Sequence, residues 1–110
     1  MTIPEMDIDT LESLWREGAV VIDVREPAEY DDAHVPGAVL IPLGEIESRV
    51  DECPADETFY VICRSGGRSA NAVEWLIAQN VDAVNIAGGT LGWISGGHDV
   101  AVGREPGSPR

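Results

Sequence analysis

The sequence has no lysine, few aromatic residues and only two cysteines. All seven basic residues are arginines, and they face twenty Asp and Glu, so the formal net charge is −13. A general role in binding nucleic acid or an anionic membrane is not expected, because both partners need a basic face. The acidic excess is consistent with a solvated surface that keeps the protein in solution. The alternative is an acidic docking face for a basic partner, and composition does not separate the two.

Long apolar runs are also missing. No segment approaches the roughly 18 apolar residues that a membrane-spanning helix needs, and the acidic segment 1–9 does not resemble a signal peptide. We therefore expect a cytoplasmic protein. Cys53 and Cys63 match no zinc-binding spacing, and two histidines provide no metal cluster. We expect no metal and no cofactor, and in a reducing compartment both thiols should be free.

The length of the chain suits one compact domain. It has 110 residues, of which 44% are hydrophobic, which is enough for a core. We place the domain at residues 1–103. The remaining segment, 104–110, is polar and contains two prolines, so we expect it to fray.

Strand-like and helix-like segments alternate along this domain. Apolar runs predict buried strands, and an apolar period near 3.6 residues predicts helices. The expected strands are 19–24, 39–41, 58–62 and 83–87, and the expected helices are 9–18, 27–32, 44–52 and 69–79. Asp9 and Glu12 form a plausible capping box for the first helix, and 88–97 is a glycine-rich segment anchored by apolar residues.

The alternation indicates an α/β fold with a parallel sheet covered by helices on both faces. In such sheets, ligands bind beyond the carboxyl ends of the strands. A functional site is therefore expected after Val24, after Ile62 or after Ala87.

The loop after Ile62 has the composition of an anion-binding site. Its residues are Cys63, Arg64, Ser65, Gly66, Gly67, Arg68 and Ser69. Two adjacent glycines allow backbone angles that turn successive N–H groups inward, and the helix that begins near Ser69 adds unpaired donors and partial positive charge. Each feature lowers the pKa of a thiol, so Cys63 should be substantially thiolate at neutral pH. The alternative interpretation is an inert buried cysteine at the end of a strand.

Four segments in order resemble the rhodanese family over about residues 5–103. They are Asp23-Val24-Arg25-Glu26 followed by Glu29-Tyr30, His34-Val35-Pro36-Gly37-Ala38, the loop from Cys63 to Ser69, and Gly88-Gly89 with Trp93. The resemblance implies five strands in a mostly parallel sheet with helices on both faces. It also implies that Cys63 is the nucleophile and that the loop amides bind the transferred sulfur.

Three charged residues are expected to support this site. Asp23 interrupts a buried strand, so it needs a partner, and an arginine is the expected one. We expect Arg25 and Glu29 to form a structural ion pair, at the rim of the site.

Other residues receive structural roles. His34 should fix a turn, and Trp93 should pack the last segment, with walling of the pocket as a second role. Cys53 lies among carboxylates, which raise the pKa of a thiol, so it should be a bystander, with a resolving cysteine as the alternative.

The predicted function is sulfur transfer through a persulfide on Cys63, from thiosulfate or another donor to a thiol, a redoxin, another acceptor protein or cyanide. One alternative is a cysteine-based phosphatase or arsenate reductase. Their motif resembles C-x5-R, whereas four residues separate Cys63 from Arg68 here, and no general acid is evident. The other alternative is a non-catalytic rhodanese-like module that binds a partner. Modules of that kind look as though the cysteine has been replaced, and Cys63 is present.

Overall fold

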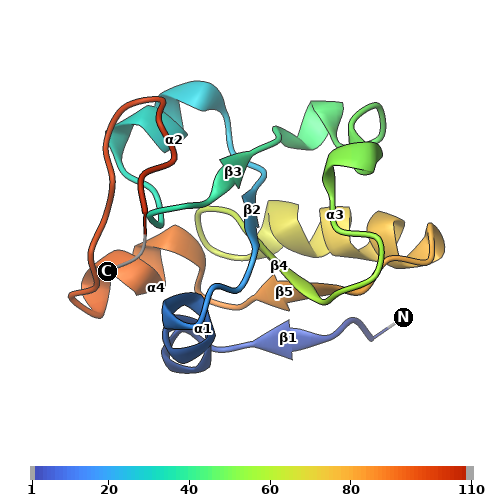
Figure 1. Ribbon diagram of the computed structural model, residues 1–110, viewed down its shortest axis with the longest axis horizontal. Helices are drawn as coiled ribbons and strands as arrows, with labels where there is room; N and C mark the ends of the chain where they lie inside the picture. Colours follow the sequence, from blue (N-terminus) through green and yellow to red (C-terminus); the bar gives the residue numbers. More distant parts are fainter. Residues whose placement is uncertain (1, 109–110) are drawn as a thin grey trace.

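The computed structural model describes residues 2–108, and within them the backbone forms one five-stranded parallel sheet (Figure 1). The strands are β1 (Glu5–Met6), β2 (Val21–Asp23), β3 (Val39–Leu40), β4 (Phe59–Ile62) and β5 (Ala83–Ile86). Their order across the sheet is β1-β5-β4-β2-β3, and each neighbouring pair is parallel. Strand β4 therefore lies in the middle of the sheet.

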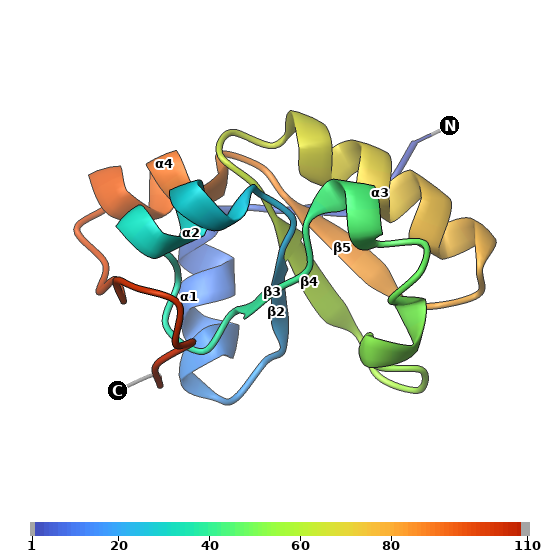
Figure 2. The ribbon, with the colours of Figure 1, turned by 90° about the horizontal axis from the view of Figure 1, so that it is seen from above.

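Helices cover both faces of this sheet. They are α1 (Ile8–Arg16), α2 (Pro27–Asp32), α3 (Gly67–Ala78) and α4 (Gly89–Ser95), together with two 3-10 turns, η1 (Leu43–Glu45) and η2 (Val50–Glu52). Figure 2 shows α3 and the segment that carries the 3-10 turns on one face, and α1, α2 and α4 on the other. The predicted α/β fold, with a parallel sheet between helices, is confirmed.

The core explains why β4 is apolar at every position. Phe59 and Val61 pack in the cluster under α3, whereas Tyr60 and Ile62 pack in the cluster with α1 and α4. Successive side chains of a strand point to opposite faces. A strand with a helix on each side therefore needs a continuous apolar run, and all four residues are buried.

Several local expectations were wrong. The first helix is capped by Asp7, whose Oδ1 accepts the Thr10 N–H at 2.8 Å, rather than by the predicted box at Asp9. The segment 44–52 forms η1 and η2 instead of one helix. Two elements were not expected from local pattern, β1 and α4. The first is a two-residue strand that exists only through its pairing with β5, and the second begins at two glycines with positive φ.

The predicted C-terminal tail contacts the domain where the structure describes it. Arg104 pairs with Asp31 at 2.7 Å, and the Pro106 carbonyl accepts the Gly37 N–H at 2.7 Å and lies 3.0 Å from Nε2 of His34. Residues 109 and 110 of that tail lie outside the described residues, and the domain boundary at 103 stays a prediction. Among residues 2–108, no helix is long and apolar enough to cross a membrane.

Candidate active site around Cys63

The central strand β4 places Cys63 at its carboxyl end, where the sequence predicts the site. Cys63 is 1% exposed. The backbone then turns through Gly66, whose φ of 115° favours glycine, and α3 begins at Gly67. This turn brings the Gly66 N–H within 3.1 Å of the Cys63 Sγ. The hydroxyl of Ser69, in the first turn of α3, lies 3.2 Å from the same sulfur.

These donors decide the charge state of the thiol. Burial acts to raise the pKa of Cys63, because the charged form is removed from water. The Ser69 hydroxyl and the amides of Ser69, Gly66 and Ser65 act in the opposite direction by hydrogen bonding to the thiolate, and together they leave the pKa below its ordinary value. The start of α3 adds its partial positive charge. The arrangement can hold a sulfur anion on Cys63 and a second sulfur attached to it.

A buried polar chain behind Ser69 was missed by the sequence reasoning. Asn85, on β5, is 1% exposed, and its Oδ1 lies 2.5 Å from the Ser69 Oγ. Its Nδ2 faces two acceptors, the Glu5 Oε2 at 2.8 Å and the Gly66 carbonyl at 3.4 Å, and this fixes the amide orientation. The Ser69 hydroxyl therefore has three acceptors within reach, the Asn85 Oδ1, the Cys63 sulfur and the Gly66 carbonyl at 3.2 Å. An asparagine inside the apolar run 83–87 was the available signal, because a buried polar group must find partners.

The first turn of α4 holds the Cys63 loop from the other side. The Thr90 N–H donates to the Cys63 carbonyl at 2.8 Å, and the Leu91 N–H donates to the Arg64 carbonyl at 3.0 Å. Gly89 lies directly against this backbone. A Cβ there would fall 2.7 Å from the Cys63 carbonyl oxygen and closer still to that of Arg64, so no other residue fits without moving the loop.

Asp23, at the end of the neighbouring strand β2, has the arginine partner that was predicted. Its carboxylate accepts from the backbone N–H and the guanidinium of Arg25, with contacts of 2.9 to 3.2 Å. Arg25 also donates to the Ala33 carbonyl at 2.7 Å, so it ties β2 to the end of α2. Both members of the pair are buried and bonded to backbone groups, which supports a structural role.

The expected ion pair between Arg25 and Glu29 was wrong. Glu29 instead accepts two hydrogen bonds from Arg68, at 2.7 and 2.8 Å, and also the Glu26 N–H. These bonds lower the pKa of Glu29 to about 2, the Arg68 bond being the largest cause. Because Arg25 is already held by Asp23, Glu29 is left for the arginine of the loop. The Arg68 guanidinium therefore ties the loop to α2, and its charge is neutralised there.

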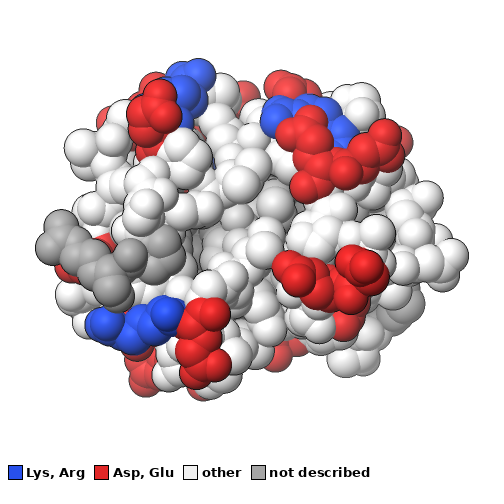
Figure 3. Space-filling view, in the orientation of Figure 1, with Lys and Arg blue, Asp and Glu red and all other residues white. Residues whose placement is uncertain are grey.

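Arg64 is different from the other arginines. Within residues 2–108, Arg16, Arg25, Arg49, Arg68 and Arg104 form ion pairs with carboxylates. Over that same range Arg64 alone has none, and it is exposed. Figure 3 shows the general pattern on one face, where each blue arginine group lies against red carboxylates. The unpaired cation therefore lies immediately after the candidate nucleophile.

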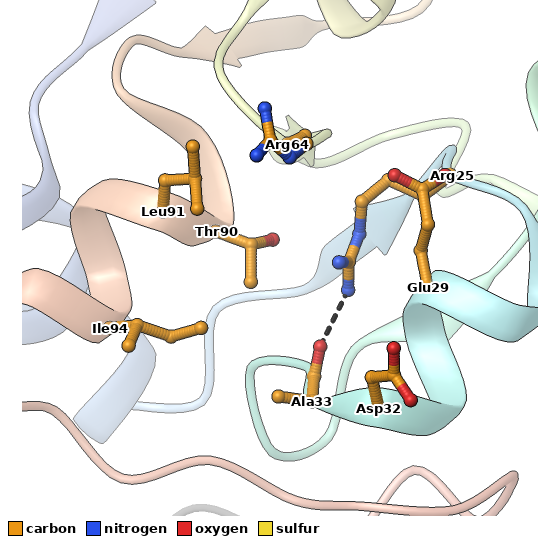
Figure 4. Close-up of a pocket in the computed structure, with 8 residues that line it drawn as sticks. All are labelled: Arg25, Glu29, Asp32, Ala33, Arg64, Thr90, Leu91 and Ile94. Atoms are coloured by element: carbon orange, nitrogen blue, oxygen red, sulfur yellow. Dashed lines mark hydrogen bonds between the residues drawn. The ribbon is translucent and has the colours of Figure 1, made fainter.

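A small cleft adjoins this loop. Its volume is about 170 Å³, and its lining residues are Arg25, Glu29, Asp32, Ala33, Arg64, Thr90, Leu91 and Ile94. Figure 4 shows Arg64, Thr90, Leu91 and Ile94 on one side, and Arg25, Glu29, Asp32 and Ala33 on the other. The cleft thus lies between the Cys63 loop, α4 and α2, beyond the carboxyl ends of the strands.

The remaining candidates lie elsewhere. Burial, followed by the charge of Glu52, raises the pKa of Cys53, in the predicted direction. His34 is buried and its ring stacks on Tyr30 at 3.6 Å, which is consistent with fixing a turn. Trp93 is fully buried and packs edge-on against Trp15 at 5.0 Å, so its predicted packing is confirmed, and it is not among the residues that line the cleft.

Comparison with known proteins gives relatives named for sulfur chemistry. The putative sulfur carrier protein YrkF of Bacillus subtilis is 38% identical over 95 residues, which are 84% of this chain and 51% of that protein. The putative sulfurtransferase YtwF of the same organism is 38% identical over 77 residues, which are 70% of this chain and 75% of the relative. The chain therefore spans about half the length of the first relative and three quarters of the second.

Solved structures agree with the fold. The rhodanese-like domain protein from Staphylococcus aureus superposes with a TM-score of 0.82 at 31% identity, covering 91% of this chain and 98% of that one. Residues 7–95 match the family model described as a rhodanese-like domain. The names of the relatives support a sulfur-transfer role, and the match shows that the chain belongs to the rhodanese-like domain family.

Proposed function

We propose that the protein transfers sulfane sulfur through a persulfide on Cys63. The observation that supports this most directly is the set of donors around one sulfur, the Gly66 amide at 3.1 Å and the Ser69 hydroxyl at 3.2 Å. A nucleophilic thiolate must be both stabilised and accessible to a donor. The donors supply the first condition, and the cleft beside Arg64 supplies an approach to the loop.

The proposed reaction has two steps. The Cys63 thiolate attacks the outer sulfur of thiosulfate or a comparable sulfane donor, a new S–S bond forms, and the old S–S bond breaks so that sulfite leaves with its electron pair. The terminal sulfur of the persulfide carries the negative charge next to the loop amides. A thiol acceptor, as its thiolate, then attacks that sulfur, and Cys63 leaves as a thiolate. No external oxidant or reductant is consumed.

Arg64 is the group best placed to hold an anionic donor. It is exposed, adjacent to Cys63 in the sequence and without a carboxylate partner among the described residues. Arg68 is not free for that role, because both of its terminal nitrogens donate to Glu29. This arrangement also weighs against phosphatase chemistry, which needs an arginine that clamps the oxyanion.

The test uses mass spectrometry of the intact protein after incubation with thiosulfate. Wild type should gain one sulfur atom, Cys53→Ser should gain the same, and Cys63→Ser should gain none because a hydroxyl forms no persulfide. Cys53→Ser is the matched control, since it replaces the other thiol by the same residue. If Cys53→Ser gains no sulfur and Cys63→Ser does, then Cys53 carries the sulfur and our assignment of Cys63 is wrong. No added sulfur in any variant would favour the partner-binding module.

A further inference from the structure

The cleft beside the Cys63 loop is lined by a residue whose buried hydroxyl has no hydrogen-bond partner among the described residues. Thr90 is 2% exposed, and its Oγ1 has no hydrogen-bond partner within residues 2–108. Figure 4 shows this oxygen pointing from the α4 wall into the cleft. A buried polar group without a partner is uncommon and costs free energy. This oxygen has almost no accessible surface, so a polar occupant of the cleft supplies the missing bond once the side chains beside the oxygen move.

Two uncommitted charges of opposite sign lie on opposite sides of the same cleft. Arg64 and Asp32 both line it, and Figure 4 shows them on opposite sides of it. Neither forms an ion pair with a described residue. The other two charged lining residues are already engaged, Arg25 by Asp23 and Glu29 by Arg68. The cleft therefore offers one cation and one anion to a ligand.

The size of the cleft limits what that ligand is. A volume of about 170 Å³ admits a molecule of a few heavy atoms. The α4 wall also presents apolar surface, since Leu91 and Ile94 are 43% and 46% exposed. A zwitterionic thiol has no net charge before its thiol ionises and a charge of −1 afterwards, so the overall charge of −13 repels it less at long range than it repels a dianion.

We infer that the cleft binds a small thiol that carries both a carboxylate and an ammonium group, as an α-amino acid does, and that this thiol accepts the sulfur from Cys63. The carboxylate pairs with Arg64, the ammonium pairs with Asp32, and Thr90 donates to or accepts from the ligand. This inference rests on the proposed function and names its acceptor class. In the step, the acceptor thiolate forms a bond to the terminal sulfur, the bond to the Cys63 Sγ breaks, and its electron pair stays on Cys63.

The connection to the reacting sulfur runs through the backbone. Arg64 follows Cys63 directly, and the Thr90 N–H donates to the Cys63 carbonyl at 2.8 Å. Cys63 itself is 1% exposed and does not line the cleft, so the link between the two is the shared loop, and a ligand anchored on Arg64 is held by the residue next to the nucleophile.

The main experiment measures the rate at which three thiols remove the sulfur from protein that carries the Cys63 persulfide. Cysteine carries both charged groups, cysteamine lacks the carboxylate, and 3-mercaptopropionate lacks the ammonium. Asp32→Asn should lower kcat/KM about threefold for cysteine and for cysteamine and leave 3-mercaptopropionate unchanged, since an exposed ion pair is worth little. Arg64→Gln should lower it for cysteine and 3-mercaptopropionate and spare cysteamine. Each comparison is variant against wild type on one thiol, so differences in intrinsic reactivity between the thiols cancel.

A control variant separates the loss of the Asp32 ion pair from the effect of a changed net charge. Glu74→Gln removes an exposed carboxylate from α3, outside the cleft, and changes the net charge by the same amount as Asp32→Asn. It should leave all three rates unchanged. If Glu74→Gln and Asp32→Asn have equal effects, or if Asp32→Asn affects all three thiols alike, the inference is overturned.

A binding measurement keeps the cleft testable even if no sulfur is transferred. S-methylcysteine, which has both charged groups and no thiol, should slow alkylation of Cys63 by iodoacetamide in wild type. Thr90→Val should weaken this protection about threefold while the protein remains folded, because the hydroxyl is removed and the shape is nearly kept. Absence of persulfide with clear protection would refute the proposed function and leave the zwitterion site standing. Persulfide formation without protection or charge selectivity would refute the site alone.

Discussion

Replacing Ser69 by alanine should suppress the Cys63 thiolate. A hydrogen bond to a charged group contributes about 1.5–3 kcal/mol. The lower end applies here, because the Ser69 hydroxyl has two acceptors besides the Cys63 Sγ at 3.2 Å, namely the Asn85 Oδ1 at 2.5 Å and the Gly66 carbonyl at 3.2 Å. A loss of about 1.5 kcal/mol corresponds to about a tenfold smaller thiolate-to-thiol ratio at a given pH. The variant should also lose about 1–3 kcal/mol of stability, since the Asn85 oxygen is left buried without a donor.

The assay is the rate of alkylation by iodoacetamide as a function of pH, in a Cys53→Ser background so that one thiol reports. The midpoint for Ser69→Ala should move to higher pH, because donors to the thiolate lower the pKa of Cys63 and one has been removed. Ser13→Ala removes an exposed hydroxyl from α1 and should leave the midpoint unchanged. Urea unfolding of each variant checks the stability cost.

Asn85→Val should shift the midpoint in the opposite direction to Ser69→Ala. Without Asn85, the Ser69 hydroxyl is left with two acceptors at 3.2 Å, the Gly66 carbonyl and the Cys63 sulfur. A charged acceptor binds a donor more strongly than a neutral one, so the midpoint should move to lower pH. If the alkylation profile of Ser69→Ala superposes on that of Ser13→Ala, the hydroxyl does not stabilise the thiolate. If Asn85→Val shifts the midpoint upward, the Ser69 hydroxyl is not the link between Asn85 and Cys63.

Three further predictions concern charge and loop length. Glu29→Gln should lower the free energy of unfolding by about 1 kcal/mol at pH 7. In wild type the contribution of Glu29 is complete above the ordinary pKa of 4.5 and is lost as the pH falls toward about 2. Urea unfolding should therefore show equal stabilities for the two proteins at low pH. Adding inert salt from a very low concentration should raise kcat/KM for thiosulfate until the Debye length reaches roughly 8 Å, because a protein of charge −13 repels a dianion; a fall from the first addition would show that the attraction of Arg64 dominates. Inserting one glycine between Gly66 and Gly67 should reduce thiosulfate:cyanide transfer about tenfold and improve inhibition by vanadate, and a folded variant with neither change would contradict the argument from loop size.

Local pattern was enough to predict four of the five strands and to indicate where a site is expected. The apolar runs that became β2, β4 and β5 and the periodic segment that became α3 are strong signals, because a parallel strand between two helix layers must be apolar on both sides. The same reasoning required a partner for Asp23, and Arg25 is only two residues away. The fold class and the need for an arginine beside Asp23 therefore followed from the sequence, whereas the identity of that arginine did not, because Arg25 was expected to pair with Glu29.

The partners of the loop were decided by the tertiary structure. Arg68 pairs with Glu29 across 39 positions, and Asn85 contacts Ser69 across 16 positions and Glu5 across 80. No local period encodes such contacts, since they depend on strand order.

The unpaired groups of the cleft were also settled in three dimensions. Sequence alone treats Arg64 and Arg68 as two equivalent cations of one loop. Only the fold brings α2 against the start of α3, where Glu29 neutralises Arg68, and brings α4 beside Cys63, where Thr90 is buried. The sequence by itself determined which residue is the candidate nucleophile and which layers enclose it. The packing of the helices over the strand ends decided which charges remain available to a ligand, because an ion pair forms only where the fold places two side chains within reach.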